Sequence, residues 1–181
     1  MYGKEIAKIL VSKEDIAVRV KELAAEINRD YAGKPLLVVC ILRGATIFFA
    51  DLFRELTGDV EVDFIAVSSY GSGASSSGEV KMLKDFSSPV VGKHLLIVED
   101  IIDTGITLVY LKKLLEARSP ASIKLCSLLD KPSRRKVELK GDYVGFEIPN
   151  EYVVGYGLDY AEKFRNLPDV CVLAPEVYGG K

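Results

Sequence analysis

The chain has 181 residues, 49% of them hydrophobic and 28% charged, with a formal net charge of −2. This length suits one globular domain that buries roughly two-thirds of its unfolded surface. We expect neither a membrane nor a nucleic-acid partner, because no apolar run approaches the ~20 residues that cross a bilayer and the charge balance gives no basic surface.

The first predicted element is a helix that begins after Ser12. The segment Ser12–Asp15 resembles a capping box, and apolar residues follow it at helical spacing. Leu36–Ile41 is a continuous apolar run, as expected for a parallel strand that is covered on both faces. Residues 42–44 then turn the chain into a second predicted helix over Ala45–Leu56.

The rest of the chain continues the alternation of strands and helices. We predict strands at Val60–Ser69, Leu95–Val98 and Ile123–Leu129, with a helix over about Ile106–Ala117. Three shorter predicted strands complete the chain: Tyr143–Phe146, Tyr152–Val154 and Val170–Leu173. Strands that alternate with helices indicate an α/β fold with a mainly parallel sheet flanked by helices.

A glycine- and serine-rich segment, residues 71–78, lies between the second and third predicted strands. Such a composition cannot form a core and is typical of a flexible linker. A linker here would leave two halves too small for this sheet pattern, so we favour a mobile lid, since long loops inside compact domains are usually functional. Ser69 and Tyr70 are its expected hinge-side residues.

The junction after the third strand is the strongest functional signal in the sequence. The apolar strand is expected to stop at Glu99 and Asp100, and the turn Asp103–Thr107 leads into the next helix. Unpaired amides at a helix N-terminus point at an anion, and the helix dipole favours its negative charge. Two threonine hydroxyls and a permissive glycine complete a cradle suited to a phosphate.

An ordinary N-cap is the simplest alternative for Asp103 or Thr104. However, acids at the carboxyl end of a buried strand repel one another unless cations or ligand donors compensate, and ligands bind at such strand ends in open α/β sheets. Glu99 and Asp100 could bind sugar hydroxyls or a divalent metal. Because adjacent strand residues face opposite ways, both can reach one ligand only if the strand has already ended.

The three cysteines indicate a reducing, cytoplasmic compartment. Cys40, Cys126 and Cys171 lie in separate apolar runs, are odd in number and lack metal-ligand spacing. We expect them to be buried thiols that behave as small hydrophobes. His94, the only histidine, is expected to be structural or at the surface, because no catalytic partner accompanies it.

The junction Glu99–Thr107 resembles the phosphoribosyl-pyrophosphate (PRPP) signature of type I phosphoribosyltransferases, and the flanking sequence is similar to the hypoxanthine-guanine branch. The resemblance runs essentially from end to end. It implies a single type I phosphoribosyltransferase domain over residues 1–181, with a mainly parallel sheet flanked by helices. It also implies a flexible lid over about residues 70–90 and a small hood subdomain formed by terminal segments that include about residues 143–181.

The resemblance also implies roles for individual residues. Asp103 would be the catalytic base that accepts the N7 proton of the purine. The residues that would bind PRPP and its 5′-phosphate are Glu99, Asp100, Asp103, Thr104, Gly105, Ile106 and Thr107. The residues that would bind pyrophosphate are Arg43, Gly44 and Arg165, where residues 42–44 match a loop that carries a non-proline cis peptide in the family. Many relatives have lysine at the position of Arg43.

The purine would be bound by residues after the fourth predicted strand and in the last third of the chain. These are Lys131, Tyr152, Val153 and Asp159. A lysine donor aimed at a ring carbonyl would accept 6-oxopurines and disfavour adenine. Tyr152 would stack on the purine where the family commonly has phenylalanine, and Arg135 would be a structural support or subunit contact.

The implied reaction is the Mg²⁺-dependent transfer of the phosphoribosyl group from PRPP to N9 of hypoxanthine or guanine. Glu99, Asp100 and Asp159 would be the metal ligands, and the enzyme would form a homodimer or homotetramer. Xanthine remains an alternative substrate. A regulator that keeps the fold but binds nucleic acid is a second alternative, and the acidic, single-domain chain disfavours it.

Overall fold

The computed structural model describes residues 3–69 and 80–179. The helices are α1 (Lys13–Asp30), α2 (Thr46–Glu55), α3 (Ile106–Glu116), α4 (Pro175–Tyr178) and the 3₁₀ turn Pro132–Arg134. The strands are β1 (Ile6–Val11), β2 (Leu36–Leu42), β3 (Val60–Ser69), β4 (Val80–Lys84), β5 (His94–Ile102), β6 (Ser122–Asp130), β7 (Tyr143–Glu147), β8 (Val153–Val154) and β9 (Val170–Leu173).

The main sheet contains six strands in the order β4-β3-β2-β5-β6-β7. All neighbouring pairs are parallel except β3 and β4, which are antiparallel. The α/β fold with a mainly parallel sheet is therefore confirmed. Because parallel strands all end at one edge, the loops after β2, β5 and β6 meet there.

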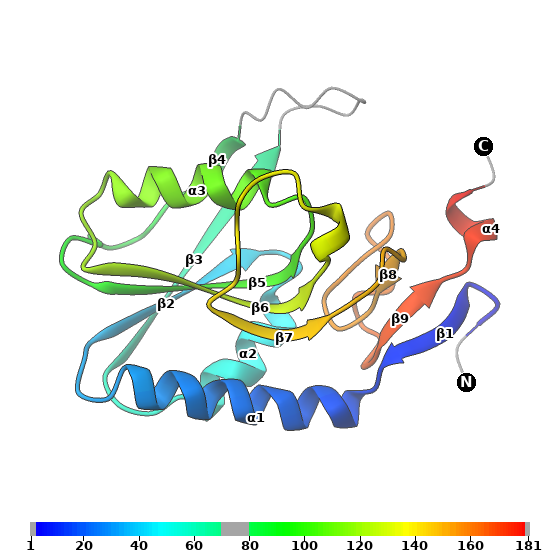
Figure 1. Ribbon diagram of the computed structural model, residues 1–181, viewed down its shortest axis with the longest axis horizontal. Helices are drawn as coiled ribbons and strands as arrows, with labels where there is room; N and C mark the ends of the chain where they lie inside the picture. The colour runs from blue at the N-terminus through cyan, green and yellow to red at the C-terminus, as the bar shows by residue number, and fades with distance from the viewer. Residues whose placement is uncertain (1–2, 70–79, 180–181) are drawn as a thin grey trace.

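The sheet is covered by helices on both faces (Figure 1). Alternate residues of a strand face opposite sides, so Val38 and Cys40 of β2 pack with α1 and α2, whereas Leu37 and Val39 pack with α3. The predicted N-cap of α1 is confirmed, since the Ser12 side chain accepts a hydrogen bond from the Asp15 amide at 3.1 Å. The result is a three-layer arrangement with the sheet in the middle.

The remaining strands form a small antiparallel sheet in the order β1-β9-β8, called the hood sheet below. Figure 1 shows it beside the end of the main sheet at which β2, β5 and β6 finish. Residues 155–169, between β8 and β9, form a connection called the hood loop below. This arrangement sets the hood loop against the loops that carry the predicted site.

The structure differs from the predicted elements at several places, among them α4 and the 3₁₀ turn, which were not predicted. β5 continues through Glu99 and Asp100 to Ile102, so the expected stop at the two acids is wrong. β7 belongs to the main sheet, so the hood sheet does not include this first part of the expected hood segment. β1 and β4 were not expected, since exposed residues interrupt the apolar pattern of β1, and β4 falls within the predicted lid.

The predicted lid is described only in part. Ser69 ends β3, and Tyr70 lies outside the described residues together with residues 71–79. Within the described residues, Cys40, Cys126 and Cys171 are buried free thiols, as expected. No helix within residues 3–69 and 80–179 is long and apolar enough to cross a membrane.

Candidate functional site

The N-terminus of α3 carries the predicted anion cradle. Its N-cap is Gly105, whose φ of 81° is left-handed and whose position has no capping side chain. The alternative that Asp103 or Thr104 is the N-cap is therefore wrong. Because no side chain caps the first turn, its amides can donate to a bound anion.

Glu99 and Asp100 lie side by side at the end of β5. Both face the same cavity although both belong to the strand, because β5 is paired with β6 through Ile102 but with β2 only as far as Val98. Burial and the neighbouring Asp100 carboxylate raise the pKa of Glu99 well above its usual range. A cation or hydrogen-bond donors from a ligand would relieve this repulsion.

The loop after β2 packs directly against these acids. The Leu42–Arg43 peptide bond is cis, as the resemblance implied. Gly44 has no room for a side chain, since a Cβ there would lie 1.7 Å from Asp100 Oδ2. Gly157 of the hood loop lies close to Gly44, because a Cβ added at Gly157 would lie 2.0 Å from the Gly44 carbonyl oxygen. The two loops therefore meet backbone to backbone.

The hood loop places Arg165 beside the contact between Gly44 and Gly157. Arg165 Nη2 lies 2.7 Å from Asp159 Oδ1, and Arg165 Nη1 donates to the Gly157 carbonyl at 2.8 Å. Arg43 pairs with Glu162 at 2.8 Å. Both arginines expected to bind pyrophosphate thus lie at one place, although they come from distant parts of the chain.

These groups line a cavity that we call the α3 cavity. Its lining residues are Ile41, Leu42, Arg43, Gly44, Val67, Glu99, Asp100, Ile101, Asp103, Thr104, Gly105, Thr107, Leu108, Asp159 and Arg165. Every residue expected to bind PRPP or pyrophosphate is present except Ile106, which begins α3. The predicted cradle and the predicted pyrophosphate loop are therefore walls of one cavity.

A second cavity, the hood cavity, adjoins the first. It is lined by Ile101, Asp103, Lys131, Arg134, Asn150, Glu151, Tyr152, Val153, Leu158, Asp159 and Tyr178. All four residues expected to bind the purine line it. Ile101, Asp103 and Asp159 line both cavities, so the two are adjacent and share part of their walls.

Lys131 is the buried cation of the hood cavity. It is 8% exposed, and its Nζ donates to the Glu151 carbonyl at 2.7 Å. Burial lowers the pKa of its ammonium group, while Asp103 acts in the opposite direction. Tyr152 is 40% exposed and therefore keeps ring surface available to a ligand.

Asp103 lies where the two cavities meet and is held by two arginines of the loop after β6. Arg134 Nε donates to Asp103 Oδ1 at 3.0 Å, and Arg135 Nη1 donates to the Asp103 carbonyl at 2.7 Å. Arg135 also pairs with the buried carboxylate of Asp130. The carboxylate of Asp103 is thus ordered and directed into the site.

Six residues that line the hood cavity were not predicted as site residues, and two of them, Tyr178 and Arg134, contact predicted ones through their side chains. Tyr178, from α4, stacks on Tyr152 with 5.1 Å between ring centroids and 28° between ring planes. A tyrosine near the end of the chain gives no signal of this contact, because it depends on how β9 places α4. Arg134 lies in the basic run after β6, so the sequence indicates its charge but not its contact with Asp103.

The donor set suits a metal that also binds substrate oxygens. Within residues 3–69 and 80–179, no three His, Cys, Asp or Glu side chains are grouped closely enough to hold a metal ion. Mg²⁺ usually takes one or two carboxylates and completes its shell with water and substrate phosphates. The Glu99–Asp100 pair fits this pattern, whereas Asp159 is already paired with Arg165.

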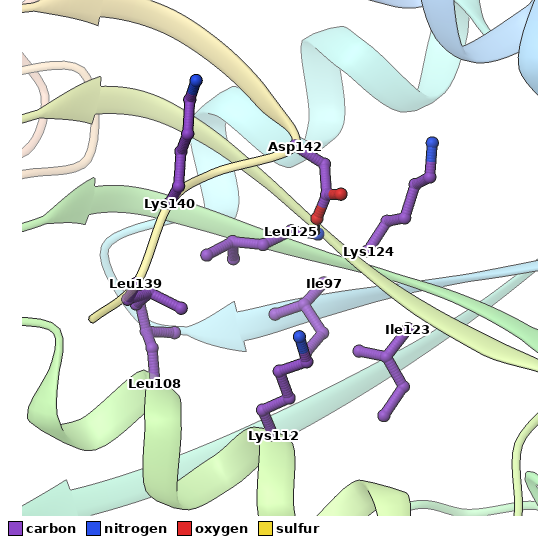
Figure 2. Close-up of a pocket in the computed structure, with 9 residues that line it drawn as sticks. All are labelled: Ile97, Leu108, Lys112, Ile123, Lys124, Leu125, Leu139, Lys140 and Asp142. Atoms are coloured by element: carbon purple, nitrogen blue, oxygen red, sulfur yellow. Dashed lines mark hydrogen bonds between the residues drawn. The ribbon is translucent and has the colours of Figure 1, made fainter. Parts of the chain in front are cut away.

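A further cavity lies between α3, β5, β6 and the segment before β7. Figure 2 shows its apolar side chains, among them Ile97 and Leu125, with Lys112, Lys124 and Lys140 around them. Its volume of about 20 Å³ corresponds to roughly one water molecule. It is therefore a packing defect beside the core and too small for a substrate.

The phosphoribosyl transferase domain family matches residues 7–161 of the chain. The hypoxanthine-guanine phosphoribosyltransferase of Lactococcus lactis is 55% identical over 175 residues, which cover 97% of this chain and 95% of that protein. The enzyme of the same name from Bacillus subtilis is 51% identical over 178 residues, which cover 98% and 99% of the two chains.

Solved structures show the same similarity. A crystal structure of a hypoxanthine phosphoribosyltransferase from Staphylococcus aureus superposes with a TM-score of 0.94 at 46% identity. The superposition covers 96% of this chain and 95% of that one. Sequence and fold thus point to the same group of proteins.

Proposed function

This chain belongs to the phosphoribosyl transferase family, and on that premise we propose that it transfers the 5-phosphoribosyl group of PRPP to N9 of hypoxanthine or guanine. The products are the nucleoside monophosphate and pyrophosphate, so the enzyme acts in purine salvage. Its three buried thiols support a cytoplasmic location. A homodimer or homotetramer is the expected assembly.

One observation carries this proposal: the α3 cavity and the hood cavity are adjacent, and Asp103 lines both. The first offers helix amides and hydroxyls to a phosphate and two arginines to a leaving group. The second offers a buried lysine and an aromatic ring to a flat heterocycle. A phosphorylated sugar and a base can therefore meet beside the Asp103 carboxylate.

In this arrangement N9 attacks C1′ of the ribose, and the bond from C1′ to the pyrophosphate oxygen breaks with its electron pair on that oxygen. Arg43 and Arg165 stabilise the departing charge. Asp103 accepts the N7 proton as N9 becomes bonded, a role typically worth ~10²–10⁴-fold. Arg134 and Arg135 hold Asp103 in position for it.

Mg²⁺ is the proposed cofactor. Glu99 and Asp100 would hold it. Asp159, also expected as a metal ligand, would have to leave its ion pair with Arg165 to hold a second ion. A divalent cation bound there would supply positive charge that offsets the charge of the phosphate groups and would make pyrophosphate a better leaving group. The raised pKa of Glu99 beside Asp100 supports a cationic occupant of this position.

Base recognition rests on Lys131 and Tyr152. The Lys131 ammonium would donate to the 6-carbonyl of hypoxanthine or guanine, and adenine presents a donor at that position. Tyr152 would stack on the ring, and the backbone of Val153 would read its edge. Xanthine carries the same 6-carbonyl, so its acceptance depends on the contacts of its additional carbonyl.

The test is PRPP consumption with hypoxanthine, guanine, xanthine, adenine and uracil, each with and without Mg²⁺. We expect turnover with the first two bases and only in the presence of the metal. Turnover with adenine or uracil, or equal rates without Mg²⁺, would contradict the proposal. Calorimetry with PRPP and Mg²⁺ gives an independent check, because the cradle must bind PRPP before any base is present.

A further inference from the structure

The two arginines expected to bind pyrophosphate share one internal carboxylate. Arg43 Nη2 donates to Glu162 Oε1 at 2.8 Å, and Arg165 Nη2 lies 3.5 Å from Glu162 Oε2. Arg43 lies in the loop after β2 and Arg165 in the hood loop, and both residues line the α3 cavity. Glu162 therefore links its own hood loop to the loop after β2, with a close contact to Arg43 and a longer one to Arg165, whose nearer partner is Asp159 Oδ1 at 2.7 Å.

The backbone holds Glu162 in this place. Its φ is 65°, and Ala161 and Phe164 also have positive φ values, of 49° and 74°. Non-glycine residues are uncommon in the left-handed region and cluster at functional sites. The Glu162 amide also donates to Asp159 Oδ2 at 2.8 Å, which fixes the turn to a residue that lines both cavities.

A carboxylate that bridges two guanidinium groups resembles a bound oxyanion. Guanidinium groups bind carboxylate and phosphate oxygens through the same paired geometry. The Glu162 side chain is 61% exposed and that of Arg43 70% exposed, so their pair can open without unfolding its surroundings. An incoming phosphate anion would meet the same two cations.

We propose that Glu162 is a positioning residue that holds Arg43 and Arg165 together in the free enzyme and competes with pyrophosphate for them. This rests on the proposed function, in which the two arginines bind the leaving group. Binding of PRPP or pyrophosphate displaces the Glu162 carboxylate. Release of the product is correspondingly helped, because Glu162 recaptures both cations as pyrophosphate departs.

The consequence is that removing this negative charge tightens pyrophosphate binding. An exposed ion pair adds little to binding or stability, so its loss should have a small effect. We therefore expect Glu162→Gln to bind pyrophosphate about two- to fivefold more tightly. The difference should shrink at high ionic strength, because salt screens exposed charges. The KM for PRPP should fall in parallel, whereas the KM for hypoxanthine should not change.

The experiment is calorimetric titration of the full chain with pyrophosphate, first alone and then with Mg²⁺, at low and high salt. Glu162→Gln is compared with Glu162→Asn, which removes the same charge and tolerates positive φ better. The matched control is Glu22→Gln on α1. It loses an exposed ion pair of the same 2.8 Å length, with Arg19, far from the cavity in sequence and fold.

Tighter binding in both Glu162 variants but not in Glu22→Gln supports the proposal. Unchanged or weaker pyrophosphate binding in the Glu162 variants overturns it. Glu162 would then have no effect on pyrophosphate binding or would hold the arginines in the arrangement that binds pyrophosphate. The proposed function fails separately, if the unmodified protein does not turn over PRPP with hypoxanthine. Binding of pyrophosphate alone is measured without turnover, so the two failures are distinguishable.

Discussion

Asp103 combines a proposed proton-accepting role with an ion pair that restrains it. Its Oδ1 already accepts from Arg134, which leaves the second carboxylate oxygen for the N7 proton of the purine. We expect Asp103→Asn to lower kcat by about 10²–10⁴-fold. PRPP affinity should be retained, because the asparagine oxygen can still accept from Arg134 and the cradle amides belong to the backbone.

Steady-state kinetics together with PRPP calorimetry would check this prediction. Glu138→Gln serves as the control, since Glu138 is an exposed carboxylate that follows the same loop and lines neither cavity. Unchanged turnover in Asp103→Asn would remove the assignment of Asp103 as the base. A loss of PRPP binding would show that the Asp103 side chain contributes mainly to binding PRPP rather than to proton transfer.

Lys131 illustrates how burial increases the effect of one hydrogen bond. A bond to a charged donor contributes about 1.5–3 kcal/mol, so Lys131→Ala should lower kcat/KM for hypoxanthine and guanine by roughly 10- to 150-fold. The KM for PRPP should change little, because Lys131 does not line the α3 cavity. Lys136→Ala, an exposed lysine of the same segment, is the matched control.

Kinetics with each base would decide the role of Lys131. If hypoxanthine and guanine react as before with Lys131→Ala, the base is recognised elsewhere in the hood cavity. Arg134 and Tyr178, two of the residues missed by sequence reasoning, would then be the next candidates.

At the scale of elements, most strands and helices could be predicted because apolar runs and helical spacing mark them directly. β3 and β9 were predicted to the residue. The end of β5 was missed because Glu99 and Asp100 interrupt the apolar run, although β6 still pairs with the strand beyond them. Local polarity marks where burial ends, whereas a strand ends where its neighbours stop pairing.

The candidate site could be located from the sequence for a related reason. Parallel topology brings the ends of β2, β5 and β6 to one edge, so motifs after each strand must meet there. The contacts of Glu162 and Tyr178 could not be predicted in the same way. Both depend on how the hood loop and α4 fold over that edge, and no local pattern in the sequence encodes this packing.

A buried carboxylate of β3 contacts the end of β4 and the segment that follows it. Asp63, 6% exposed, accepts from the Ser87 and Phe64 amides, each at 2.7 Å, and lies 3.3 Å from Lys84 Nζ. Burial acts to raise the pKa of Asp63, but these donors outweigh it and leave the pKa below its ordinary value. This carboxylate therefore fixes the start of the segment after β4.

Because the pKa of Asp63 is lower in the folded protein, its ionised carboxylate stabilises the fold above the unfolded-state pKa of about 3.9. This stabilisation is lost as the pH falls through the folded-state pKa. Asp63→Asn should therefore lower the free energy of unfolding by about 1–3 kcal/mol at pH 7. The difference from the unmodified protein should shrink below about pH 4. Chemical denaturation at several pH values would show this, with the exposed Asp59→Asn as control. An equal difference at every pH would contradict it.

At the scale of the whole molecule, the site is shared between two sheets. Asp100 comes from β5 of the main sheet and Arg43 from the loop after β2, whereas Asp159 and Arg165 come from the hood loop. A ligand that contacts both groups adds a connection between the main sheet and the hood. Ligand binding should therefore stabilise the complete fold against unfolding.

Thermal unfolding with pyrophosphate and Mg²⁺ tests whether one ligand contacts both the main sheet and the hood loop. A ligand at 100 times its Kd adds about 2.7 kcal/mol to the free energy of unfolding. For a chain of this size, this raises Tm by roughly 5–11 °C. Arg43→Ala and Arg165→Ala should each reduce the shift at the same ligand concentration, because each removes a cation from one wall of the α3 cavity. Arg29→Ala, on exposed α1 surface, should leave it unchanged. A full shift in Arg165→Ala would mean that the ligand contacts the main sheet alone and that the hood loop covers the site without binding its contents.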